Sequence, residues 1–148
     1  MDKINMFIQI FIGVILFLSS IKDIKSRQIS MTLMMFGMVV LCMCIPFRED
    51  LSMIDGLLGT AVGFIMIGIG KLTRWKIGMG DGIVLIFSGI GVGFWDNIVI
   101  LLYSLFIIFI FTVILLLMKK ITLKTTLPFV PFLFLGYLGM IFSKNLAI

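Results

Sequence analysis

The chain has 148 residues, of which 61% are hydrophobic, and its mean hydropathy is +1.29; because soluble domains are only about half apolar, this composition excludes a soluble globular protein. The net charge of +5 does not indicate a nucleic-acid-binding protein, since the cations are spread over short loops between apolar runs. The chain contains no histidine, which excludes Ser-His-Asp and Cys-His catalysis and any zinc or haem site built on histidine.

Six apolar segments follow one another along the chain, and most approach the roughly 20 residues that a helix needs to cross a bilayer. Their unbroken runs lack the period-two alternation of β-barrel strands. We therefore expect an all-α membrane protein with about six transmembrane helices in a single domain, residues 1–148. The first segment lacks a small-residue cleavage site, so we expect a retained helix and not a signal peptide. The segments are Ile4–Ile21, Ile29–Phe47, Leu51–Leu72, Gly82–Trp95, Ile98–Met118 and Leu127–Phe142.

Several features inside these segments are interpreted as structural. Cys42 and Cys44 lie in an apolar run, and a lone C-x-C offers too few ligands for a metal, so we expect small buried hydrophobes and no disulfide. The third and fourth segments are rich in glycine, and pairs four residues apart, such as Gly59 and Gly63, are typical of close helix packing. The fourth segment is short, and Asp96 with the asparagine after it is predicted to cap the fifth.

Two aspartates lie where an apolar segment meets a short basic stretch. Asp23 begins DIKSRQIS, residues 23–30, and Asp81 ends GMGD, residues 78–81. A carboxylate beside hydrocarbon is costly to keep ionised, which favours a functional role. Considered singly, each also has a structural interpretation, with Asp23 as a polar loop residue balanced by lysines and Asp81 as a helix N-cap. Gly78 and Gly80 lack a Cβ, so we expect them to let a substrate backbone, or the helix bearing Asp23, come close.

Lysine and arginine are distributed unevenly between the two ends of the predicted helices. With an even number of spans, nine of the twelve fall on one face and three on the other. The positive-inside rule makes the first face cytoplasmic, so both termini are expected to be extracytoplasmic. Of the acids, only Asp23 and Asp81 fall on the cytoplasmic face. The nine cations are Lys22, Lys25, Arg27, Lys71, Arg74, Lys76, Lys119, Lys120 and Lys124, and the three are Lys3, Arg48 and Lys144.

A pair of carboxylates can hydrolyse a peptide bond without histidine, thiol, metal or cofactor. One ionised acid activates water, and one protonated acid gives its proton to the leaving amine. Two acids close together in a low dielectric cannot both ionise, so they titrate as a coupled pair. The neighbouring cations, Lys25 and Arg27 among them, would hold at least one negative charge near neutral pH. Asp23 and Asp81 are therefore the predicted catalytic pair, with no metal or cofactor.

Three motifs resemble those of the type IV prepilin peptidases, membrane aspartyl proteases of the GxGD kind. DIKSRQIS resembles the family's Asp, alternating basic residues and Ile after the first helix, and GMGD matches its second motif. PFVPFLFLG, residues 128–136, resembles the proline-rich entry to its last helix, and the resemblance covers essentially the whole chain. Pro128 and Pro131 would break the start of that helix and free backbone groups for an extended substrate, although a simple helix entry after a loop is the alternative.

The resemblance implies that this protein removes the short leader of a type IV prepilin at the cytoplasmic face of the cell's inner membrane. Cleavage would fall just before the hydrophobic N-terminal helix of the pilin, with Asp23 and Asp81 as the catalytic pair. The larger bacterial relatives carry an insertion with paired C-x-x-C motifs linked to N-methylation of the product. This chain lacks such motifs, so it resembles the compact peptidase-only form that serves Tad-type pili, and no methyltransferase activity is predicted.

The resemblance has two departures. Many relatives place a lysine two residues after the second Asp, where this chain has Ile83. Either Lys76 or Arg74 would have to supply the positive charge of that lysine, or the site lacks this charge. Ser30 stands where proline is usual, which we regard as minor.

Other functions stay open at this stage. The departure at Ile83 is compatible with a catalytically silent membrane subunit of a pilus or secretion machine. A small transporter that uses Asp23 and Asp81 as proton or cation sites is disfavoured, because transporters place such acids near the bilayer midplane. A metal-dependent enzyme acting on lipid phosphates would need more than two carboxylates on the active face.

Overall fold

The computed structural model describes residues 3–48, 51–73, 78–122 and 125–146. Within these ranges the chain is all α-helical and has no strand, which confirms the expected fold class. The helices are α1 (Lys3–Ser26), α2 (Met31–Cys44), α3 (Met53–Leu72), α4 (Met79–Val92), α5 (Phe94–Leu117) and α6 (Val130–Leu146), with a 3₁₀ helix η1 (Ile45–Phe47) after α2.

Three helices, α1, α3 and α5, are long and apolar enough to cross a membrane. The other three are apolar but shorter, and α4 has 14 residues, which confirms the short fourth segment. The long helices bury little of their surface in the protein, and α5, with a mean hydropathy of 3.1, is only 11% buried over its most apolar stretch. An apolar helix that leaves most of its surface uncovered by its own chain needs hydrocarbon around it. The protein is therefore a membrane protein.

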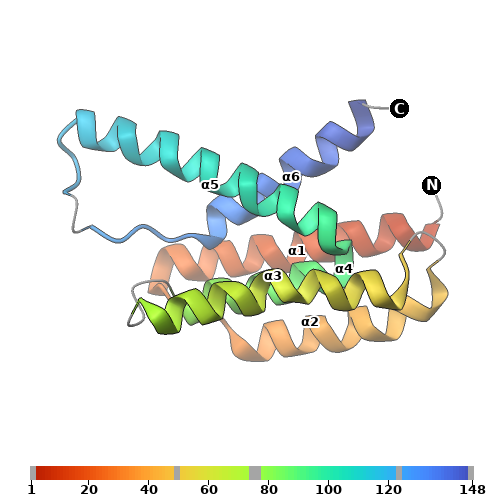
Figure 1. The fold of residues 1–148 in the computed structure, drawn as a ribbon. Coiled ribbons are helices and arrows are strands. Elements are labelled where there is room, and N and C mark those ends of the chain that lie inside the picture. The colour runs from red at the N-terminus through yellow and green to blue at the C-terminus, as the bar shows by residue number, and fades with distance from the viewer. Residues whose placement is uncertain (1–2, 49–50, 74–77, 123–124, 147–148) are drawn as a thin grey trace.

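The six helices form two groups, as Figure 1 shows. α1, α2, α3 and α4 run side by side, whereas α5 and α6 cross each other on one side of them. Both termini lie at one end of the molecule, which we call the termini end. The last turns of α1 and α3 and the connection between α5 and α6 lie at the other, which we call the opposite end.

α4 is the centre of the packing. It contacts α1, α2, α3 and α5, and more than half of its residues are buried. Phe87 of α4 has no exposed surface, and its ring lies against Gly37 of α2, where a Cβ would come within 2.6 Å of the ring. One turn further along the same face of α4, Gly91 faces Ile12 of α1 and Leu41 of α2. Small residues on α4 thus let neighbouring helices approach from several directions.

The predicted close packing of the third and fourth segments is confirmed. A Cβ on Gly59 would meet the backbone of Gly89, and a Cβ on Gly63 would lie 2.6 Å from the backbone nitrogen of Ile86. Because the obstacles are backbone atoms, they cannot move aside as a flexible side chain would. The two helices are therefore in backbone-to-backbone contact along this seam.

Two boundaries near the aspartates differ from the sequence prediction. α1 continues past Ile21 to Ser26, so Asp23 lies within the helix and is not a loop residue. α4 begins at Met79 rather than Gly82, with Gly78 as its N-cap, so Asp81 lies in the first turn and is not the cap. Both aspartates are therefore fixed on regular secondary structure.

The break between the fourth and fifth segments was also predicted in the wrong place. α5 begins at Phe94, and Asp96 lies inside its first turn instead of capping it. The break occurs at Gly93, whose φ of +87° is a conformation that residues with a Cβ rarely adopt. The cysteine prediction is wrong for Cys42, which is exposed because it lies off the buried stripe formed by Met34, Gly37 and Leu41 on α2.

Candidate active site

Asp23 lies in the last turns of α1 and is 7% exposed. Its carboxylate Oδ2 accepts a hydrogen bond from the backbone N–H of Val130, the first residue of α6, at 3.2 Å. Ser20, one turn earlier on α1, donates to the carbonyl oxygen of the same Val130 at 3.3 Å. Both backbone groups of Val130 are thus bound by side chains of α1. The start of α6 is fixed against the aspartate, where the free N–H groups of a helix N-terminus favour a negative charge.

Asp81 lies three residues after the N-cap Gly78, in the first turn of α4. Its carboxylate accepts a hydrogen bond from the backbone of Gly78, which is the capping-box arrangement of an acid that turns back to the helix cap. A Cβ on Gly78 would lie 3.2 Å from Asp81 Oδ2. The first glycine of GMGD therefore makes room for the carboxylate itself.

The two carboxylates line one cavity of about 440 Å³ at the opposite end of the molecule. They lie close enough for the charge of Asp23 to act on Asp81. The walls come from four helices and from the segment before α6; the other lining residues are Arg27, Met66, Gly78, Leu105, Ile108, Thr126, Leu127, Pro128 and Phe129. Since a water molecule occupies about 30 Å³ in the liquid, the cavity has room for several waters or a short stretch of peptide.

Gly80 has a different role from the one predicted. A Cβ there would clash with the side chain of Ile29, which belongs to the DIKSRQIS stretch. Neither a substrate nor α1 itself occupies this space. The second glycine of GMGD instead lets the residues that follow Asp23 pack against the start of α4, and this contact brings the two motifs together.

Arg27 is the cation that lines the cavity within the described part of the chain. It follows α1 with a left-handed φ of +51°, and its Nη1 donates to Thr126 Oγ1 at 3.1 Å. Lys25 is exposed and is not among the described lining residues. Ile83 packs against the hydrophobic core. Arg74 and Lys76, the other proposed sources of charge, lie outside the described residues.

A family model described as the type IV leader peptidase family matches residues 10–114, well over half of the chain. The chain belongs to the type IV leader peptidase family. The match covers both aspartates and both glycines of GMGD, and it ends before the proline-rich stretch. No curated protein and no solved structure matches this family member.

The two prolines of this leader peptidase family member line different cavities. Pro128 lines the cavity, whereas Pro131 lines a neighbouring apolar groove of about 260 Å³ with Ile24, Phe111 and Phe132. The N–H of Val130 between them is bound by Asp23, so it is not free for a substrate in this structure. Sequence analysis missed Ser20 and Thr126. The spacing of Ser20 and Asp23, three residues apart on one helix, is the signal that could have revealed the first.

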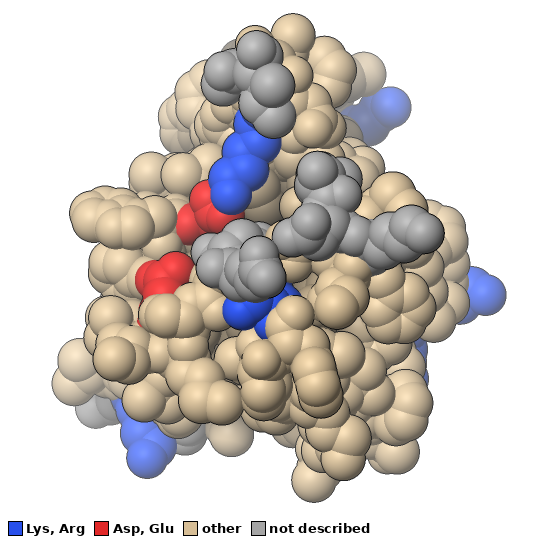
Figure 2. Space-filling model, turned by 90° about the vertical axis from the view of Figure 1, so that its right-hand side faces the viewer, with Lys and Arg blue, Asp and Glu red and all other residues tan. Residues whose placement is uncertain are grey.

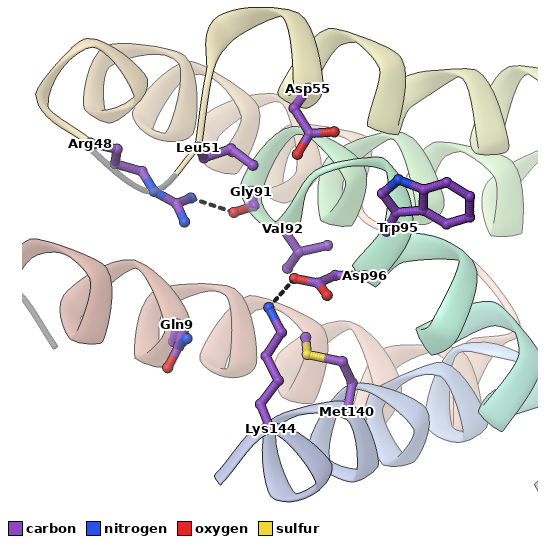
Figure 3. Close-up of a pocket in the computed structure, with 10 residues that line it drawn as sticks. All are labelled: Gln9, Arg48, Leu51, Asp55, Gly91, Val92, Trp95, Asp96, Met140 and Lys144. Atoms are coloured by element: carbon purple, nitrogen blue, oxygen red, sulfur yellow. Dashed lines mark hydrogen bonds and ion pairs between the residues drawn. The ribbon is translucent and has the colours of Figure 1, made fainter. Parts of the chain in front are cut away.

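A second polar pocket lies at the termini end, far along the helices from the aspartate pair. Figure 2 shows acidic and basic side chains near one another on this face. Figure 3 shows that its charges are engaged within the protein. Lys144 of α6 pairs with Asp96 of α5, and Arg48 donates to the carbonyl of Gly91. Asp55 accepts from the N–H of Phe94 at 3.3 Å. These contacts join helices at this end, so we interpret the pocket as structural.

Among the described residues no group of three or more His, Cys, Asp or Glu side chains comes together in a way that could hold a metal. What the opposite end offers chemically is a pair of carboxylates, a guanidinium and an apolar wall around one cavity. Each carboxylate has one backbone hydrogen bond that orients it, and each has a second oxygen with which it can bind water or substrate.

Proposed function

We propose that this protein is an aspartic-type endopeptidase that removes the leader of type IV prepilins, of the Tad-like kind, with residues 1–148 acting as a single membrane domain. The observation that supports this most strongly is that Asp23 and Asp81, 58 positions apart in the sequence, line the same cavity in a chain of the leader peptidase family. Family membership supports a prepilin-type substrate. The acid pair supports the reaction type.

The proposed mechanism uses the pair as acid and base. The ionised carboxylate takes a proton from a water molecule as the water oxygen attacks the carbonyl carbon of the scissile bond. The protonated carboxyl then gives its proton to the departing amine as the C–N bond breaks. The products leave as a new carboxylic acid and a new amine, and the pair holds one proton, as it did before the reaction. Arg27 stands beside the pair and stabilises the single negative charge that the pair carries throughout.

The proposed location is the inner, cytoplasmic membrane, with the cavity facing the cytoplasm. The uneven distribution of lysine and arginine supports this orientation. The described cations Lys22, Lys25, Arg27 and Lys119 belong to the ends of α1 and α5, at the same end of the molecule as the cavity. A leader on the cytoplasmic side would then reach the aspartates from water, while the apolar helix behind it stays in the membrane.

A leader-removal assay tests this proposal. The purified protein is placed in lipid vesicles with a substrate made of a short basic leader, a glycine and an apolar helix, and the products are read by mass spectrometry. We expect the leader to be removed even when EDTA or serine- and cysteine-directed inhibitors are present, because the proposed chemistry needs only carboxylates. Loss of activity in EDTA would contradict the acid pair. No cleavage of several prepilin-type substrates would favour the silent-subunit alternative.

A further inference from the structure

The carboxylate cavity has an apolar wall on one side. Met66 of α3 and Leu105 and Ile108 of α5 line the same cavity as Asp23 and Asp81. Leu105 is 45% exposed, so no part of this protein covers it fully. The wall and the acids together make a surface that is polar on one side and hydrocarbon on the other. A water-soluble peptide would leave the hydrocarbon side uncovered.

α3 and α5 are fastened together near the termini end. Asn97 of α5 has no exposed surface, and its Nδ2 donates to the carbonyls of Gly59 on α3 and Leu85 on α4, both at 2.9 Å. Its Oδ1 accepts a hydrogen bond from Ser88 at 2.7 Å. All three partner groups lose a hydrogen bond if the Asn97 side chain is removed. This buried group of hydrogen bonds, which we call the Asn97 cluster, fixes three helices at one point.

Beyond the Asn97 cluster, α5 diverges from α3 but stays in contact with α6, where the centroids of the Phe111 and Phe132 rings lie 5.3 Å apart. Its buried residues, Asn97, Ile100 and Ser104, all lie in its first half, and none of its residues from 105 to 117 is buried. Figure 1 shows α5 leading away from α3 toward the opposite end. α3 and α5 thus diverge from Asn97 toward the opposite end, where residues of both helices line the carboxylate cavity; we call this part of the cavity the wedge.

We propose that the apolar helix of the substrate enters this wedge sideways from the membrane, between α3 and α5, and packs against Met66, Leu105 and Ile108. This inference rests on the proposed function and adds the path of the substrate. The scissile bond lies at the start of an apolar helix, so the bond and the helix must be bound together. The wedge is the place where an apolar wall is continuous with both carboxylates.

The groove beside Pro131 is the competing path. It is apolar, and Ile24, Phe111 and Phe132 are among the residues that line it. It includes neither aspartate among its lining residues, because Leu127 and Pro128 stand between it and the cavity and line both. A helix lying there would have to pass its scissile bond over this segment to reach the acids.

Cross-linking distinguishes the two paths. Cys42 and Cys44 are first replaced by serine. Leu105→Cys or Ile108→Cys then marks the wedge, and Phe111→Cys marks the groove. Met35→Cys, 67% exposed on α2, marks a helix that lines neither. Asp81→Asn is added to keep the substrate uncut. A substrate with one cysteine in the first turn of its apolar helix is then treated with a bis-maleimide in vesicles. We expect several-fold more cross-linked product at positions 105 and 108 than at positions 111 or 35.

The same set of proteins separates failure of this inference from failure of the proposed function. Each cysteine variant with Asp81 intact is first shown to remove the leader. If the variants cleave but cross-link mainly at 111, or equally at all four positions, or at none, the wedge is not the path. If the unmodified protein removes no leader, the proposed function itself fails.

Discussion

Each carboxylate of the candidate pair is held by a backbone group that becomes available where a helix begins. Asp23 accepts from Val130 at the start of α6, and Asp81 accepts from Gly78 at the start of α4. The sequence could reveal that two acids stand beside apolar segments, and the family motifs selected both. It could not reveal the Val130 contact, because 107 positions separate the partners and only the fold joins them.

Arg27 combines an unfavourable backbone conformation with a place beside the acids. A left-handed φ costs a residue with a Cβ about 1–2 kcal/mol, which glycine avoids. Arg27→Gly should therefore keep or raise the thermal midpoint while the leader-removal rate falls several-fold, since the guanidinium and its bond to Thr126 are lost. Lys25→Gln is the matched control, and it should change little because Lys25 is exposed and away from the described cavity lining. An unchanged rate in Arg27→Gly would remove Arg27 from the site.

The contact between α3 and α4 shows what patterns within one helix can and cannot predict. Glycines four residues apart indicated close packing, and the backbone contacts at Gly59 and Gly63 confirm it. The end of α4 was placed too late. The polar pair that begins at Asp96 resembled a helix cap, but the chain turns at Gly93. Several closely spaced glycines precede this turn, and the sequence does not show which of them takes the positive φ.

A pair of glycine substitutions tests this seam. A Cβ at Gly63 would meet the backbone of α4, whereas a Cβ at Gly68, on the same helix, would meet nothing within 4 Å. Overpacking of a tight contact costs typically about 1–3 kcal/mol. Gly63→Ala should thus lower the thermal midpoint of the detergent-solubilised protein, while Gly68→Ala leaves it unchanged or raises it slightly by favouring the helix. Equal effects of the two substitutions would contradict the seam.

The distribution of charges along the sequence agrees with the positions of the termini and the cavity in the fold. The chain's two termini lie at one end and the carboxylate cavity lies at the other, as the charge count at the helix ends predicts for an even number of spans. The number of spans itself was predicted from six apolar segments, yet within the described ranges three helices reach full spanning length. A single sequence cannot show that the short helix α4 is enclosed by its neighbours, since that depends on packing.

Cysteine labelling tests the orientation. In a protein with Cys42 and Cys44 replaced by serine, Ser143→Cys marks the end of α6 and Thr125→Cys marks the connection before it; both positions are exposed. A maleimide that cannot cross membranes should label position 143 in intact cells and label position 125 only after the membrane is opened. Labelling of position 125 in intact cells would reverse the orientation and place the cavity outside the cytoplasm.

The central claim is that Asp23 and Asp81 together cut the leader. The most direct measurement is leader removal, read by mass spectrometry, with Asp23→Asn and Asp81→Asn compared with Asp55→Asn, whose carboxylate lies in the termini-end pocket. Asparagine is similar in size but cannot act as an acid or base. We predict complete loss of cleavage in the first two variants and retained cleavage in the third, with all three proteins inserted in the membrane. Cleavage by either of the first two variants would contradict the claim.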